Sequence, residues 1–100
     1  MSSDLFDLSG EVAVVTGAGR GIGEGIAKLL ADYGASVVCA ARRTSEIERV
    51  AGEIVAANGK AIACTSDVTK VNDLSKLAQI AIDEFGQLDM WVNNAGGSAV

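Results

Sequence analysis

The chain has 100 residues, of which 49% are hydrophobic and 21% are charged, and it contains neither proline nor histidine. This length and composition suit one globular α/β unit with a single core of modest size. The net charge of −5 and the pI of about 4.5 argue against a protein that grips nucleic acid or an anionic membrane, because such proteins present a basic face.

Residues 1–8 carry acids where a secretory signal has its positive region, and no apolar run is long enough to cross a bilayer. We therefore expect a cytoplasmic protein with no membrane partner. Cys39 and Cys64 each lie in an apolar strand-like run, where a reduced thiol packs as a small hydrophobe. Two thiols without any histidine offer too few ligands for a transition-metal site.

Short β-branched runs alternate with longer stretches of helical period along the chain. The runs predict four strands, at about residues 12–16, 35–41, 61–65 and 88–93. Because crossovers between parallel strands are right-handed, the pattern indicates a Rossmann-type, doubly wound parallel sheet. The expected architecture is a three-layer α/β/α sandwich with strand order 3-2-1-4, and its ligand crevice lies beyond the carboxyl ends of strands one and four.

Three helices are predicted between these strands, each with one apolar face. The expected inward-facing residues are Ile22, Ile26, Leu29, Leu30 and Tyr33 in the first helix, Ile47, Val50, Ala51, Ile54 and Val55 in the second, and Val71, Leu74, Leu77, Ala78, Ala81 and Phe85 in the third. Thr44 or Ser45, the latter with Glu48 in a capping box, is expected to cap the second helix, and Thr69 the third. The expected C-terminal signals are Gly34, Asn58-Gly59 and Gly86.

A glycine-rich turn, T-G-x-x-x-G-x-G, runs from Thr16 to Gly23 and joins the first strand to the first helix. Gly17 allows a sharp turn, Gly21 lets the backbone approach a phosphate, and Gly23 lets the helix press on the sheet. The free N–H groups and the helix dipole then face an anion, such as a dinucleotide pyrophosphate. A tight turn that binds nothing is the alternative, but four glycines in seven residues are an unfavourable way to begin a helix.

The segment from Thr16 to Gly23, the pair Asp67-Val68 and the run Asn93-Asn94-Ala95-Gly96 together resemble the short-chain dehydrogenase/reductase family. The resemblance covers the chain from Leu8 onward. It implies that the turn contacts a nicotinamide dinucleotide through Gly17, Gly19, Arg20, Gly21, Ile22 and Gly23. It also implies that Thr16 ties the first strand to the turn after the fourth.

The same resemblance implies that Asp67 and Val68 hold the adenine ring, and that Asn94, Ala95 and Gly96 pass along the ribose and nicotinamide. Capping of the third helix does not readily explain Asp67, which precedes Thr69 by two residues. An ordinary turn aspartate remains the alternative there. A plain strand-ending turn is the alternative for the asparagine-glycine run.

The end of the second strand bears on the choice of coenzyme. NAD-binding sites usually place an acid there to receive the ribose hydroxyls, and this chain has Ala41 instead. Arg42 and Arg43 follow at once, and Arg20 adds a third cation near the same place. We therefore predict NADP, with NAD less favoured and solvated surface arginines as the plain alternative.

The family's catalytic serine and Tyr-x-x-x-Lys pair do not match any residues of this chain, so no catalytic residue is assigned. Tyr33 is followed four positions later by Val37 rather than lysine, and Ser98 lies too close to the fourth strand. We expect residues 1–100 to be the N-terminal part of one dinucleotide-binding domain, and to fold poorly in isolation because one sheet edge is uncovered.

The resulting hypothesis is an NADP-dependent oxidoreductase that transfers hydride between the nicotinamide and a small-molecule alcohol or ketone. By resemblance, the complete protein is expected to be a homotetramer or homodimer. One alternative is a non-catalytic NADP(H)-binding module or regulatory subunit. Another is a truncated product with a purely structural or interaction role.

Overall fold

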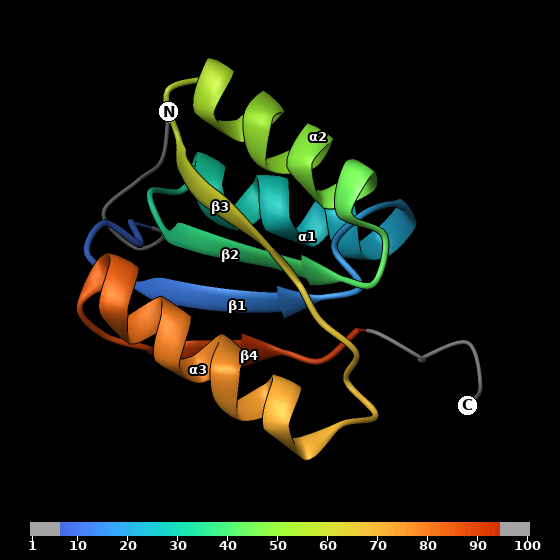
Figure 1. Ribbon diagram of the computed structural model, residues 1–100. Helices are drawn as coiled ribbons and strands as arrows, with labels where there is room; N and C mark the ends of the chain where they lie inside the picture. Colours follow the sequence, from blue (N-terminus) through green and yellow to red (C-terminus); the bar gives the residue numbers. More distant parts are fainter. Residues whose placement is uncertain (1–6, 95–100) are drawn as a thin grey trace.

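The computed structural model describes residues 7–94, in which four strands alternate with three helices (Figure 1). The elements are β1 (Val12–Thr16), α1 (Gly21–Asp32), β2 (Ser36–Ala41), α2 (Thr44–Ala56), β3 (Lys60–Thr65), α3 (Val71–Phe85) and β4 (Met90–Val92). The sheet has the order β3-β2-β1-β4, and every pairing is parallel. The predicted doubly wound fold is thus confirmed.

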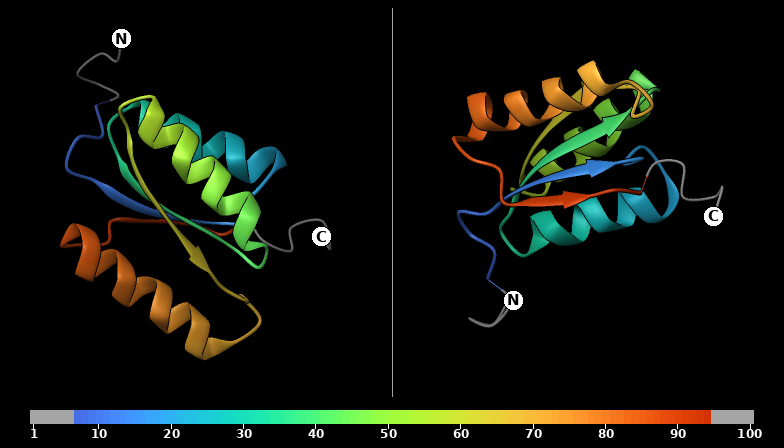
Figure 2. Two further views of the ribbon diagram at one scale, coloured as in Figure 1. Left: turned by 45° about the horizontal axis from the view of Figure 1, so that its top comes forward. Right: turned by 90° about the horizontal axis from the view of Figure 1, so that it is seen from below.

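The helices cover the two faces of this sheet unequally (Figure 2). Alternate residues of β1 point to opposite faces: Val15 joins a core with α1 and α2, whereas Val12 and Val14 join a core with α3. The sheet therefore lies between two helical layers, which gives the predicted three-layer sandwich.

The inner face of α1 differs from the predicted one. Its buried residues are Gly23, Ala27 and Ala31, whereas Ile22 and Leu29 are 75% and 55% exposed. Small residues face the sheet because α1 packs too closely for branched side chains, so the larger apolar residues lie at the sides or outside. Two further predicted inward residues, Val55 of α2 and Val71 of α3, are also exposed.

The predicted side-chain caps are also wrong. Helices α2 and α3 begin after Arg43 and Lys70, and neither cap residue makes a side-chain capping bond. The hydroxyl of Thr44 instead lies 2.6 Å from that of Thr65, so it bonds across to β3. The predicted C-terminal signals are confirmed. Gly34, Asn58 and Gly86 all have the left-handed backbone that ends a helix.

The two cysteines are free, as predicted, but they are not equally enclosed. Cys39 on the central strand β2 is fully buried, and this burial raises the pKa of its thiol to about 11. Cys64 on the outer strand β3 is only partly buried, so it is not the core thiol that its apolar neighbours suggested. In the part of the chain that the structure describes, no helix is long and apolar enough to cross a membrane.

Candidate functional site

The predicted site residues within the described range gather at one edge of the sheet. Because all four strands are parallel, the turns after β1, β2, β3 and β4 leave the sheet on the same side (Figure 1). The ladder continues briefly into two of these turns: Ala18 N–H donates to the carbonyl of Ala40, and Ser66 N–H donates to that of Ala41. Ala95 and Gly96 lie outside the described residues.

The glycine turn has the backbone that its sequence predicts. Gly17 and Gly21 have φ angles of 64° and 59°, a region that favours glycine. A Cβ on Gly23 would overlap the carbonyl of Gly17 and lie 2.7 Å from Nδ2 of Asn94. Gly23 is therefore the point where α1, the turn and the end of β4 touch, and no larger residue fits there.

The start of α1 is suited to an anion. Arg20 at the N-cap is extended and makes no side-chain capping bond, so the N–H groups of the first turn are not occupied by a cap. Ile22, in that turn, is exposed and offers an apolar surface beside those groups. An anion bound there would complete the helix terminus.

Thr16 ties β1 to the end of β4, as the family resemblance implied. Its buried hydroxyl accepts a bond of 2.9 Å from Asn94 N–H and lies 3.3 Å and 3.2 Å from the carbonyl of Val92 and Oδ1 of Asn93. The Asn94 side chain donates in turn to the carbonyl of Gly17, at 3.3 Å. The asparagine thus fixes the glycine turn against β4.

Asp67 stabilises its own turn. Its Oδ1 accepts bonds from the Thr69 hydroxyl at 2.6 Å and the Thr69 N–H at 3.0 Å. These bonds, helped by the positive charge of Arg42, lower the pKa of Asp67. Asp67 thus has the turn role that was the alternative from the sequence, while its contact with adenine stays a prediction. Val68, beside it, is partly buried.

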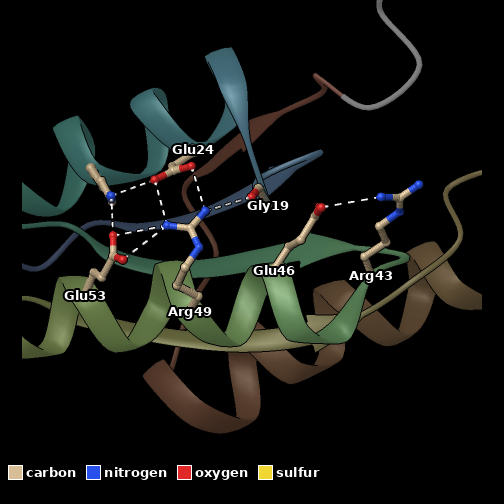
Figure 3. Close-up of polar contacts among 7 residues, drawn as sticks. Gly19, Glu24, Arg43, Glu46, Arg49 and Glu53 are labelled. Carbon is tan, nitrogen blue, oxygen red and sulfur yellow. Dashed lines mark hydrogen bonds and ion pairs between the residues drawn. The ribbon is translucent and has the colours of Figure 1, made fainter.

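The cations expected at the second strand lie where predicted. Arg42 and Arg43 follow β2 and are exposed. Nη1 of Arg43 lies 3.6 Å from Oε2 of Glu46, in the first turn of α2. Glu46 also packs against Gly19, so an acid does stand near the glycine turn although the end of β2 lacks one (Figure 3).

A second group of charged residues near the turn was not predicted. Arg49 and Lys28 both bridge Glu24 of α1 to Glu53 of α2, at distances between 2.6 Å and 3.3 Å (Figure 3). Bonds from Arg49 and then Lys28 lower the pKa of Glu24 to about 2. The spacing of four between Glu24 and Lys28 hints at one pair, but the link between helices depends on the fold.

The sheet order, the glycine turn and the open terminus of α1 define a Rossmann-type nucleotide-binding fold. The family model for short chain dehydrogenases matches residues 11–100, and the chain belongs to this family.

Several curated relatives are similar over nearly the whole chain. The 7alpha-hydroxysteroid dehydrogenase of Escherichia coli (strain K12) is 45% identical over 96 residues, which are 96% of this chain and 38% of that protein. Versicolorin reductase 1 of Dothistroma septosporum is 45% identical over 97 residues, which cover 96% of this chain and 37% of the relative. The chain therefore spans less than two-fifths of the length of these relatives.

Similar solved structures belong to the same family and hold one of two coenzymes. A 7 alpha-hydroxysteroid dehydrogenase complexed with NADH and 7-oxo glycochenodeoxycholic acid superposes with a TM-score of 0.92 at 44% identity, covering 97% of this chain and 38% of that one. A metagenomic short-chain oxidoreductase in complex with NADP has a TM-score of 0.85, also at 44% identity, and covers 90% of this chain and 41% of that one. Members of the family thus hold either nicotinamide coenzyme.

Proposed function

We propose that this chain is the coenzyme-binding, N-terminal part of an NADP-dependent oxidoreductase that exchanges hydride with an alcohol or ketone. The observation that carries the proposal is the pairing of an uncapped, glycine-lined helix start with Arg42 and Arg43, which stand beside Ala41 where an NAD site usually has an acid. The complete protein is expected in the cytoplasm as a homotetramer or homodimer.

In this proposal the glycine turn binds the pyrophosphate and the arginines bind the 2′-phosphate. The proposed contacts are Gly17, Gly19, Arg20, Gly21, Ile22 and Gly23 in the turn, Arg42 and Arg43 after β2, Asp67 and Val68 after β3, and Asn94, Ala95 and Gly96 after β4. Backbone N–H groups suit the shared pyrophosphate, whereas guanidinium forks suit a phosphate that NADP has and NAD lacks.

NAD is the competing coenzyme, and one contact favours it. Glu46 ion-pairs with Arg43 and packs on Gly19, so its carboxylate would lie near the adenosine ribose. We favour NADP because Arg42 is not engaged by Glu46 and Arg20 adds a second cation beside the turn.

The test is a fluorescence titration of the complete protein with NADPH and NADH. We expect NADPH to bind more tightly, and Arg42→Ala to weaken NADPH by about tenfold to a hundredfold while changing NADH far less. Lys76→Ala, which removes an exposed charge from α3, is the matched control and should change neither affinity. An unchanged preference in Arg42→Ala would contradict the choice of NADP.

A non-catalytic NADP(H)-binding module is the second candidate, since a coenzyme site by itself does not require turnover. Incubation of the complete protein with NADPH and a ketone panel separates the two. Oxosteroids are suitable first substrates, because one relative is named a hydroxysteroid dehydrogenase and one similar structure holds a 7-oxo compound. Coenzyme binding without any turnover across the panel would favour the module.

A further inference from the structure

Helix α2 holds the middle of the glycine turn at Gly19, which is buried (Figure 3). Nη2 of Arg49 donates a bond of 3.3 Å to the Gly19 carbonyl. A Cβ on Gly19 would lie 2.8 Å from Cβ of Glu46 and 2.9 Å from its Oε1. Gly19 is thus held through its carbonyl and packed closely at its Cα, both times by side chains of α2.

Arg49 is itself fixed by two carboxylates. Its Nη2 lies 3.0 Å from Oε1 of Glu24, in the first turn of α1, and its Nη1 lies 3.1 Å from Oε2 of Glu53, one turn along α2. One planar guanidinium therefore joins α1, α2 and the glycine turn. A lysine has one nitrogen where Arg49 uses two, Nη2 for Gly19 and Glu24 and Nη1 for Glu53, so we expect Arg49→Lys to lose the Gly19 contact.

The bond to Gly19 has a geometric consequence for the turn. The peptide that joins Gly19 to Arg20 is planar and trans, so its carbonyl and its N–H point in opposite directions. With the carbonyl directed at Arg49 on α2, the Arg20 N–H is directed away from α2. The bond also limits the rotation of a glycine that would otherwise move freely.

We propose that Arg49 is a positioning residue for the coenzyme: it holds the Gly19 carbonyl, and thereby presets the N–H groups of the glycine turn for a pyrophosphate. The proposal rests on the proposed dinucleotide function. A turn that is ordered before binding loses less conformational entropy when the coenzyme arrives. Arg49 need not touch the coenzyme to have this effect.

The experiment titrates NADPH into the complete protein and its Arg49→Met, Arg49→Lys and Lys28→Met variants. Lys28 is the matched control, because its bonds go to the same two carboxylates while those of Arg49 also reach Gly19. Arg49→Met and Arg49→Lys should each weaken NADPH by about fivefold to tenfold, and Lys28→Met by less than about twofold. Thermal melts should show a similar small loss for Arg49→Met and Lys28→Met.

Kinetics give a second measurement if the protein turns over. A positioning role raises the KM for coenzyme and leaves kcat at saturating coenzyme unchanged. Full affinity in Arg49→Lys would overturn the inference, because charge alone would then suffice. Equal losses in Arg49→Met and Lys28→Met would also overturn it. If the wild-type protein binds neither NADPH nor NADH, the proposed function itself fails.

Discussion

The two faces of the sheet differ in how many helix residues are buried against them. On one face, α1 and α2 contribute six buried residues to the core, and Ala18 of the turn that begins α1 is part of the same core. On the other face α3 buries only Leu77 and Ala81, and Trp91, which pairs with Val14 on this face of the edge strand β4, is 38% exposed. Ile82 on α3 is 46% exposed as well.

The difference in burial between the two faces indicates which part of the proposed site is held by well-packed elements. The glycine turn leads into α1, the two arginines lead into α2, and Asn94 bonds to the glycine turn, whereas Asp67 lies in the turn that leads into α3. The phosphate end of the coenzyme is thus expected to meet a preformed surface. We propose that later parts of a longer domain cover the α3 and β4 side.

The largest expected effect comes from removing one core side chain on each face of the complete protein. Leu77→Ala and Ile47→Ala each truncate a side chain that is fully buried, and each should cost about 2–5 kcal/mol. Hydrogen exchange should separate them. Leu77→Ala leaves α3 with one fully buried residue, Ala81, beside the partly buried Phe85, so the amides of α3 should lose protection before the rest.

Ile47→Ala should behave differently, because Val50, Ala51 and Ile54 still anchor α2. The amides of α2 are expected to exchange only through global unfolding. If α2 in Ile47→Ala exchanged as early as α3 does in Leu77→Ala, the two faces would be equally secured and the contrast drawn above would be wrong.

A glycine pair on α1 tests how tightly the first face is packed. Gly23→Ala would place a methyl group into the Gly17 carbonyl, so the turn must shift and NADPH affinity should fall by about a hundredfold. Gly25→Ala, two residues along the same helix, meets nothing within 4 Å. It should stabilise the protein by about 0.5–1 kcal/mol and leave NADPH affinity unchanged.

A fluorescence titration and a denaturant melt of each variant are sufficient. Near-normal coenzyme binding by a folded Gly23→Ala variant would mean that the turn adapts, and that the contact between α1 and the glycine turn is looser than the structure has it.

Much of this architecture could be read from the sequence, because it rests on local patterns. The alternation of strand and helix periods gives the sheet order, and the glycine spacing gives the turn after β1. The inner face of α1 could not be predicted by choosing the largest apolar residues, since close packing at Gly23 selects alanine and glycine there instead. The caps failed because other partners competed: the fold brings Thr65 to Thr44, and Asp67, only two residues away, bonds Thr69.

The charged group that joins α1 to α2 could not be predicted from the sequence, because folding brings its two helices together. A change in this group gives the smallest expected effect. The folded pKa of Glu24, about 2, lies below its ordinary value of 4.5. Its ionised form is therefore favoured by folding, so its stabilisation is complete above the ordinary pKa and is lost as pH falls from 4.5 towards 2. Glu53 has a lowered pKa for the same cause, bonds from Lys28 and Arg49, and acts in the same direction.

Glu24→Gln should lower the melting temperature of the complete protein at about pH 7 by a few degrees at most, because exposed ion pairs contribute little. The gap from wild type should shrink as pH falls through the window between 4.5 and about 2. Glu84→Gln removes an exposed carboxylate from α3 and is the matched control, which should leave the melting temperature at about pH 7 as in wild type. A gap that stays constant down to about pH 3 would show that the bridge between α1 and α2 adds no pH-dependent stability, and that apolar packing alone distinguishes the two faces.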